Sequence, residues 1–229
     1  MNDKKIKYIW FIVILFFPNF FAVLYAEKTI NSNKVEINHI QIDKQKKEIR
    51  LKASLSITQG ILEYLLVSEY GKTYESIFKI SENMPSELNF ALMLIGCEPV
   101  PFKLVQHFKS GGDVIHQLKK KYPKSFLDIR FLVNGKSIDI FQLIEKREKT
   151  KETLYWVYTG GFFDQKNKYA GDLELSYIGI WPDKSAPVNL ISKNGNPYQG
   201  QLGFEVNIKN QEINKDSVIE IVLSLGVDY

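Results

Sequence analysis

The sequence predicts an α+β fold with mainly antiparallel sheets built from hairpins, one buried helix at about residues 85–96 and a short second helix at about residues 113–122. Apolar and polar residues alternate through most of the chain, which is the pattern of strands with one buried face. Turn-forming residues separate these stretches. One stretch breaks the alternation with a nearly continuous apolar run that carries helix signals at both ends.

The first 26 residues differ in composition from the rest of the chain. Three lysines, at 4, 5 and 7, precede an apolar run and then a stretch that ends at Ala26. This order is typical of a cleaved secretory signal peptide, so we expect residues 27–229 to form a single domain that is periplasmic or secreted. The alternative is an inner-membrane anchor formed by residues 8–26, because a span needs about 20 apolar residues.

Composition excludes several kinds of partner and site. The formal net charge is +4, and loss of residues 1–26 removes three lysines and one aspartate, which leaves +2. Such a near-balance predicts no nucleic-acid partner. Cys97 is the only cysteine, which excludes an internal disulfide, an all-cysteine zinc site and an iron–sulfur cluster. The three histidines lack metal-site spacing, so we expect no metal and no cofactor. We also expect no membrane span in the mature chain.

Two pairs of strands are expected before the first helix. Residues 35–43 and 48–57 alternate on either side of a polar turn, and residues 61–67 and 73–80 do so around a connection at 68–72. Alternation on both sides of a short polar connection is typical of antiparallel hairpins. We therefore expect four antiparallel strands in this part of the chain.

The first helix has signals at both ends. Pro85 suits the first turn, Glu87 suits the positive end of the helix dipole, and Gly96 can take the left-handed position after the last turn. Almost every residue between them is apolar. We therefore expect the helix to be buried on most sides, with Phe90 and Met93 in the core.

The second helix is short. Asp113 is a typical N-cap, and Pro123 ends the helical pattern at about residue 122. Lysines crowd its last turn, where positive charge suits the helix dipole. A solvated helix end explains these lysines without a ligand.

The strongest local signal in the chain is the Asn134-Gly135 dipeptide, which favours a type I′ turn between two alternating stretches. The register that follows pairs Phe131 with Ile138, Ile129 with Ile140, and Arg130 with Asp139 as an ion pair. A charged joint at residues 146–152 follows and is the place where the domain would divide if it had two parts. Further strands are expected at residues 154–160, 173–181, 202–208 and 217–225.

Two glutamates flank the connection at residues 68–72. If that connection has five residues, Glu63 and Glu75 become diagonal neighbours on one sheet face, about 7–8 Å apart at Cα. That separation suits a two-carboxylate acid–base or nucleophilic site, with Tyr74 and Lys72 positioning a substrate. If the connection has two residues, the glutamates lie on opposite faces. A solvated sheet face is the alternative that needs no chemistry.

The densest aromatic stretch leads into a polar loop. It contains Trp156, Phe162 and Phe163, and the loop runs from Asp164 to Asp172. The loop is similar in outline to a calcium loop, but lysines occupy two positions that need oxygen ligands, which argues against calcium. Aromatic residues at strand spacing are more typical of a core than of a sugar-stacking surface. The loop and the exposed sheet face are nevertheless the expected binding surfaces.

Four segments of the chain form a recognisable series: ILEYLLVSEYGKTYES (61–76), MPSELNFALMLIGCEP (84–99), LYWVYTGGFF (154–163) and YAGDLELSYIGIWPD (169–183). Together they resemble the YdjY-domain family of exported bacterial proteins, in which a GK-x-HES turn precedes a Pro-capped helix and a W-V-x-TG strand. The resemblance implies a fold consistent with the expected strands and helix. It implies no particular reaction, because the family has no settled biochemical activity.

The departures from the family pattern bear on chemistry. Tyr74 and Asn89 stand where the family usually has histidines. If those histidines serve a metal or proton-transfer site in relatives, this chain lacks both, because tyrosine with a pKa near 10 is a poor base at neutral pH. The stretch at residues 102–124 is longer than the family's usual connection, and it is either a surface that contacts a partner or a simple elaboration.

We therefore expect an exported cell-envelope protein without enzymatic activity that binds another protein or a small ligand. The alternative is a hydrolase-like enzyme that uses the Glu63/Glu75 carboxylate pair. A third hypothesis, inherited metal binding, would need Glu75, Tyr74 and Asn89 to converge.

Overall fold

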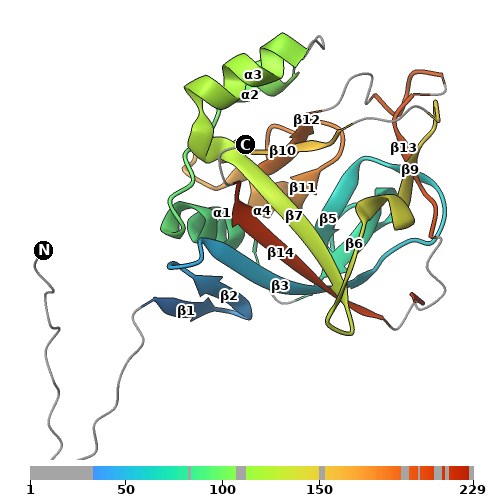
Figure 1. The fold of residues 1–229 in the computed structure, drawn as a ribbon, viewed down its shortest axis with the longest axis horizontal. Helices are drawn as coiled ribbons and strands as arrows, with labels where there is room; N and C mark the ends of the chain where they lie inside the picture. The colour runs from blue at the N-terminus through green and yellow to red at the C-terminus, as the bar shows by residue number, and fades with distance from the viewer. Residues whose placement is uncertain are drawn as a thin grey trace, which may run out of the picture. The chain divides into compact units, whose positions relative to one another are not determined.

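The main sheet closes on itself as an eight-stranded barrel (Figure 1). In spatial order its strands are β3 (Glu48–Leu55), β14 (Val218–Leu225), β7 (Phe126–Val133), β10 (Tyr155–Tyr158), β12 (Val188–Ile191), β11 (Ser176–Gly179), β5 (Tyr64–Ser68) and β6 (Ser76–Ile80). The barrel closes because β6 also pairs with β3. The expected α+β fold of antiparallel hairpin sheets is therefore wrong: the protein is mostly β, with a closed barrel and few, short helices.

The computed structural model describes residues 33–81, 84–106, 112–149, 153–191, 196–200, 202–208, 213–214 and 217–226. Residues 33–229 belong to one compact unit. The expected signal peptide at residues 1–26 lies outside the described residues.

Smaller strands extend the barrel. A hairpin of β1 (Lys34–Ile37) and β2 (Ile40–Asp43) adds to β3, and β8 (Lys136–Ile138) adds to β7. A separate three-stranded sheet joins β4 (Ile61–Leu62), β13 (Phe204–Val206) and β9 (Ile144–Lys146). The charged joint expected at residues 146–152 thus begins at the end of β9.

Two neighbouring pairs in the barrel are parallel, β5 with β6 and β11 with β12. The expected hairpin of residues 61–67 and 73–80 is therefore wrong, since Tyr64 faces Ser76 and Leu66 faces Phe78 in a parallel register. All positions of β5 and all but one of β6 are buried. Strands covered on both faces are typical of parallel pairs, and a nearly continuous apolar sequence does not distinguish them from hairpin strands.

The Asn134-Gly135 hairpin is confirmed. Both residues have positive φ, as a type I′ turn requires, and Phe131 pairs with Ile138. The ladder ends at Ile138, so the expected pairing of Ile129 with Ile140 and the ion pair between Arg130 and Asp139 are wrong. Asp139 instead accepts a hydrogen bond from the Phe141 backbone.

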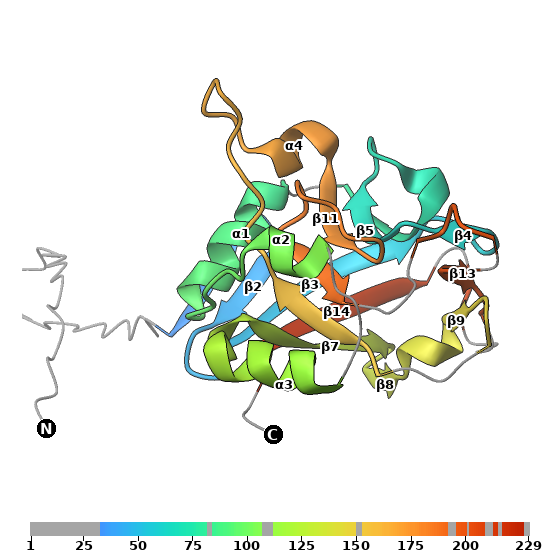
Figure 2. The same ribbon diagram turned by 90° about the horizontal axis from the view of Figure 1, so that it is seen from above.

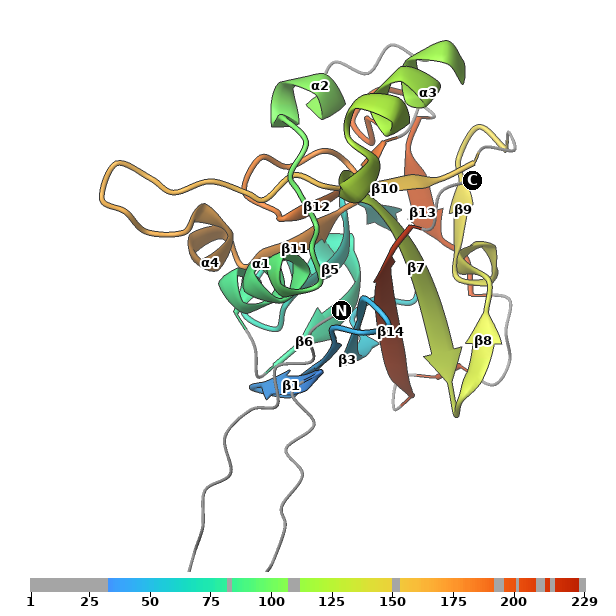
Figure 3. The same ribbon diagram turned by 60° about the vertical axis from the view of Figure 1, so that its left-hand side comes forward.

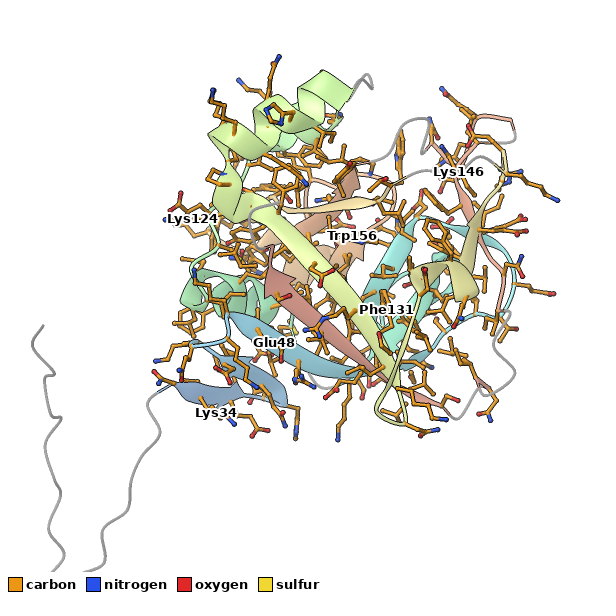
Figure 4. The ribbon with its side chains drawn as sticks, in the orientation of Figure 1. Lys34, Glu48, Lys124, Phe131, Lys146 and Trp156 are labelled. Carbon is orange, nitrogen blue, oxygen red and sulfur yellow. The ribbon has the colours of Figure 1, made fainter. Side chains whose placement is uncertain are left out.

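Arg130 pairs with Glu48, which lies two strands away in the barrel, and not with Asp139 of its own hairpin. Its guanidinium lies 2.6 Å from a carboxylate oxygen of Glu48, whose other oxygen is 2.8 Å from Arg50. Arg50 also pairs with Glu220 on the intervening strand β14. Figure 4 shows Glu48 on β3, beside β14. The network joins β3, β14 and β7 on the outer face, a long-range pairing that the hairpin register could not predict.

The two expected helices are confirmed as α1 (Pro85–Leu94) and α3 (Gly112–Lys121). Two others, α2 (Phe102–Gln106) and α4 (Ala170–Glu174), were not expected. The burial expected of α1 is only half right. Leu88 and Leu92 are buried, but Phe90 and Met93, expected in the core, are 49% and 55% exposed.

The stretch at residues 102–124 covers part of the barrel. Val105 of α2 and Leu118 of α3 form a second apolar cluster with Val157 of β10 and Ile191 of β12. Figure 3 shows α2 and α3 together at one end of the molecule, next to β10. This longer connection therefore has a packing role.

The crossover between β11 and β12 is held by Asn189, which is fully buried. Its amide oxygen accepts a hydrogen bond of 2.7 Å from the Asp183 backbone, and its amide nitrogen donates to Thr159 Oγ1 at 2.8 Å and to the Asp183 carbonyl at 3.0 Å. Gly179 on the neighbouring strand leaves room, since a Cβ there would lie 2.7 Å from the Asn189 amide oxygen.

Replacing this amide should weaken the fold. We expect Asn189→Leu to lower the free energy of unfolding by about 3 kcal/mol, because it leaves buried backbone and hydroxyl groups without partners. Urea unfolding followed by circular dichroism measures the change. The matched variant Gln41→Leu, at an exposed position on β2, should stay within about 0.5 kcal/mol of the wild type. Equal effects of the two substitutions would contradict this role of Asn189.

Candidate functional site

The backbone brings Glu63 and Glu75 together at the start of β5. The Glu63 N–H donates to the Glu75 carbonyl at 2.9 Å. The Glu63 carbonyl in turn accepts from Ile180 and Trp181, which follow β11. The connection between β5 and β6 ends in a 3₁₀ turn, Thr73–Glu75. The parallel crossover, and not a hairpin register, therefore makes the two glutamates neighbours.

Their side chains form a cluster with a lysine and a tyrosine, which we call the carboxyl cluster: Glu63, Glu75, Lys72 and Tyr198. The Glu63 carboxyl group raises the pKa of the Glu75 carboxyl group, so the two groups interact. Lys72 Nζ lies 3.5 Å from Glu63 Oε2, and Tyr198 Oη donates to Glu75 Oε1 at 3.2 Å. The Glu63 side chain is only 10% exposed. Two neighbouring carboxyl groups disfavour double ionisation, so the cluster favours a proton on one of them.

The electrostatics of the cluster favour a proton on Glu75. Burial raises the pKa of Glu75, and the hydrogen bond and charge of Glu63 raise it further, although Tyr198 and Lys72 oppose the change. Partial burial lowers the pKa of Lys72, but the neighbouring carboxylates outweigh it and the net shift is upward. Burial and both carboxylates raise the pKa of Tyr198, so its phenol stays protonated and donates.

A second polar chain adjoins the carboxyl cluster. Lys72 Nζ is 3.5 Å from Tyr64 Oη, which donates to Asp183 Oδ2 at 3.0 Å. The other Asp183 oxygen accepts from the backbone and hydroxyl of Ser185, and this hydroxyl is 3.0 Å from that of Ser176. The chain links the connection after β5 to the crossover after β11.

The other residues expected at this site lie outside the carboxyl cluster. Tyr74 is 68% exposed and points away from the core. Asn89, on α1, accepts a hydrogen bond from Tyr158 on β10. Glu75, Tyr74 and Asn89 therefore have separate surroundings, which gives no support to the inherited metal site. Tyr198 was missed because it lies far along the chain in a loop that carries no signal.

The aromatic candidates divide between core and surface. Trp156 is 5% exposed and lies among the barrel strands, so it is a core residue (Figure 4). Phe162 is half-buried, with Lys184 Nζ 4.3 Å from its ring centre. Phe163 is exposed and contacts the ring of Tyr169.

The two aspartates of the following loop are structural. Asp164 accepts hydrogen bonds of 2.8 Å from the backbones of Lys166 and Lys168 and so shapes the loop. Asp172, on α4, accepts one of 2.8 Å from the Ser86 backbone in the first turn of α1. A carboxylate suits that position because the N-terminal end of a helix is positive.

Helices α1 and α4 lie side by side (Figures 1 and 2). Apolar side chains on and around them are exposed. Their closeness depends on Gly171, where a Cβ would approach Pro85 to 3.0 Å. Five of the twelve large apolar side chains that are exposed among the described residues belong to these helices or their flanks. We call them the α1–α4 surface: Met84, Phe90, Met93, Phe163 and Leu173, with exposed fractions of 43–64%.

No family model matches the chain. No curated protein and no solved structure matches it either. The resemblance to the YdjY-domain family, carried by four short segments, stays an expectation.

Two kinds of feature are absent from the described residues. None of the helices in the ranges given above has the length and apolar character that a membrane crossing requires. In the same part of the chain, no group of three or more His, Cys, Asp or Glu side chains is placed to hold a metal ion.

The proton on Glu75 should affect stability. Folding raises the pKa of Glu75 above 4.5. The stability that protonated Glu75 contributes is therefore complete below pH 4.5 and is lost as the pH rises through the folded-state pKa. Glu75→Gln keeps an oxygen for Tyr198 but cannot ionise. We therefore expect this variant to gain stability relative to the wild type as the pH rises from 4.5 to neutrality, as measured by urea unfolding.

The matched control is Glu36→Gln, at an exposed position on β1. Its difference from the wild type should not follow the same trend. A Glu75→Gln curve that stays parallel to that of the wild type across this range would show that folding does not raise the pKa of Glu75.

Proposed function

We propose that this is an exported cell-envelope protein that binds a partner protein through the α1–α4 surface. The observation that carries the proposal is that five large, exposed apolar side chains lie on, or flank, two helices that contact each other. Contiguous exposed apolar surface on a soluble domain is typical of protein–protein interaction sites, whereas single exposed apolar residues need no explanation.

The arrangement of α1 supports an interface. Leu88, Ala91 and Leu92 are buried against the barrel, while Phe90 and Met93 face away from it. The two exposed residues are three apart and therefore lie on the same side of the helix. Phenylalanine and methionine are enriched at interfaces, because they provide large apolar contact area and methionine adapts its shape.

The loop before α4 supports it as well. This loop projects from the barrel and carries Phe163 (Figures 2 and 3). The turn at Asp164 and the isolated bridge between Phe163 and Tyr169 fix its backbone. An aromatic residue on a shaped loop loses less conformational freedom when a partner binds, so more of its contact energy contributes to affinity.

Substitutions on α1 test the binding proposal. We expect the double variant Phe90→Ser/Met93→Ser to lose about tenfold or more of its affinity for the partner, because central apolar contacts dominate interface energy. Tagged wild type and variant are compared by cross-linking in an envelope extract and quantitative mass spectrometry. The expected export is tested on the same tagged protein. We expect it in the envelope fraction of the cell, with Glu27 as its N-terminal residue.

The control variant is Tyr70→Ser, which removes a side chain that is 79% exposed outside the α1–α4 surface. It should recover the same partner as the wild type. The proposal fails if no protein is enriched by the wild type, or if the double variant, still folded by circular dichroism, enriches the same protein equally.

A second candidate function is hydrolysis at the carboxyl cluster. It is favoured by the contact between the Glu63 and Glu75 carboxyl groups beside Lys72. Two acids whose surroundings differ can divide the roles of general acid and general base. Glu75, with its raised pKa, would donate the proton, and Glu63 would accept one from water.

Isosteric amides test hydrolysis. With a panel of nitrophenyl esters and glycosides, we expect Glu63→Gln and Glu75→Gln each to lower the rate by about 100-fold or more, as removal of an acid or base does. Glu36→Gln should keep the wild-type rate. A wild type without activity on the panel, or amide variants that keep it, would leave the cluster with a structural role only.

A further inference from the structure

An open pocket of about 600 Å³ lies on the barrel where β3 pairs with β6. Seven residues line it: Ser54, Leu55, Ser56, Ile57, Thr58, Gln59 and Lys79. Ser54 and Lys79 face each other across the two strands. The volume is in the range of sites that bind small molecules.

The lining has the chemistry of an anion site. It provides one ammonium group, three hydroxyls and one amide, and it contains no carboxylate. The Ser56 hydroxyl donates to the Thr73 carbonyl at 2.6 Å and fixes one wall. Within the described part of the chain, the side chains of Ser54, Thr58, Gln59 and Lys79 make no hydrogen bond or ion pair, so they are available to a ligand.

Lys79 differs from Lys72 and Lys146, which both have carboxylate partners. Lys72 pairs with Glu63, and Lys146 lies 3.3 Å from Glu148. Lys79 is half-buried yet has no carboxylate partner among the described residues. A partly desolvated ammonium group gains from a counter-ion, and a charged donor makes stronger hydrogen bonds than a neutral one.

We propose that this pocket binds a small ligand through an oxyanion, with Lys79 as the charged donor and Ser54, Thr58 and Gln59 as neutral donors. Phosphate, sulfate and carboxylate groups share this chemistry. The site is separate from the α1–α4 surface, so it does not depend on the binding of a partner protein.

The pocket lies near the carboxyl cluster along the chain. Gln59 and Glu63 are four residues apart, so their Cα atoms are within about 14 Å of each other. The Ser56 hydroxyl bond to Thr73 also joins the pocket wall to the turn that contains Glu75. Anion binding needs neither carboxyl group and can be measured without any assay of activity.

Titration with three anions tests the proposal. Sodium phosphate, sulfate and glucuronate are added to the full-length protein at constant ionic strength and followed by amide NMR. We expect at least one anion to shift the amides of residues 54–59 and 79 in a saturable way. Lys79→Gln should weaken that binding about tenfold or more, and Ser54→Ala several-fold, since a charged donor contributes more than a neutral one.

The matched control is Lys52→Gln, an exposed lysine two residues before Ser54 on the same face of β3. It should change the affinity less than twofold. The proposal is overturned if none of the three anions gives saturable shifts, if the shifts spread over exposed lysines generally, or if Lys52→Gln and Lys79→Gln weaken binding equally. The ranking of the three anions identifies the group that the site prefers.

Discussion

The parallel pairing of β5 with β6 is the constraint on which the barrel depends. The barrel closes because β6 pairs with β5 on one edge and with β3 on the other, and the chain reaches this position by crossing back to the start of β5. The same crossover places the backbone of Glu75 beside that of Glu63. The connection is shorter than the dozen or so residues usual between parallel strands. The position of β6 in the barrel and the carboxyl cluster thus both depend on one short connection.

Local sequence signals predicted the elements that depend only on neighbouring residues. The Asn134-Gly135 turn and the boundaries of α1 and α3 follow from backbone preferences and helix caps, and the structure has all three. The closed barrel was not predicted, because its strands pair with partners far along the chain: β14 with β3 and β7, and β6 with β3. Alternation shows that a strand has a buried face but does not identify its partner.

The candidate site shows the same division. Glu63, Glu75 and Lys72 were singled out from one segment of sequence. The hairpin register that was expected to bring them together is wrong, because β5 and β6 are parallel. Tyr198 and Asp183 were not expected, since no local pattern relates a distant loop tyrosine to a carboxyl pair. For α1, an almost wholly apolar sequence predicted burial on most sides. The barrel covers one side of this helix and leaves Phe90 and Met93 exposed.

The hydrogen bond from Ser86 to Asp172 joins two segments that are 86 residues apart in the chain. The first turn of α1 is therefore completed by a helix that lies between β10 and β11 in the chain, and the α1–α4 surface needs both segments in place. A protein that recognises this surface would bind the folded domain and would not bind a nascent or partly unfolded chain. Recognition at α1–α4 would thus distinguish a chain in which these two segments have met from one in which they have not.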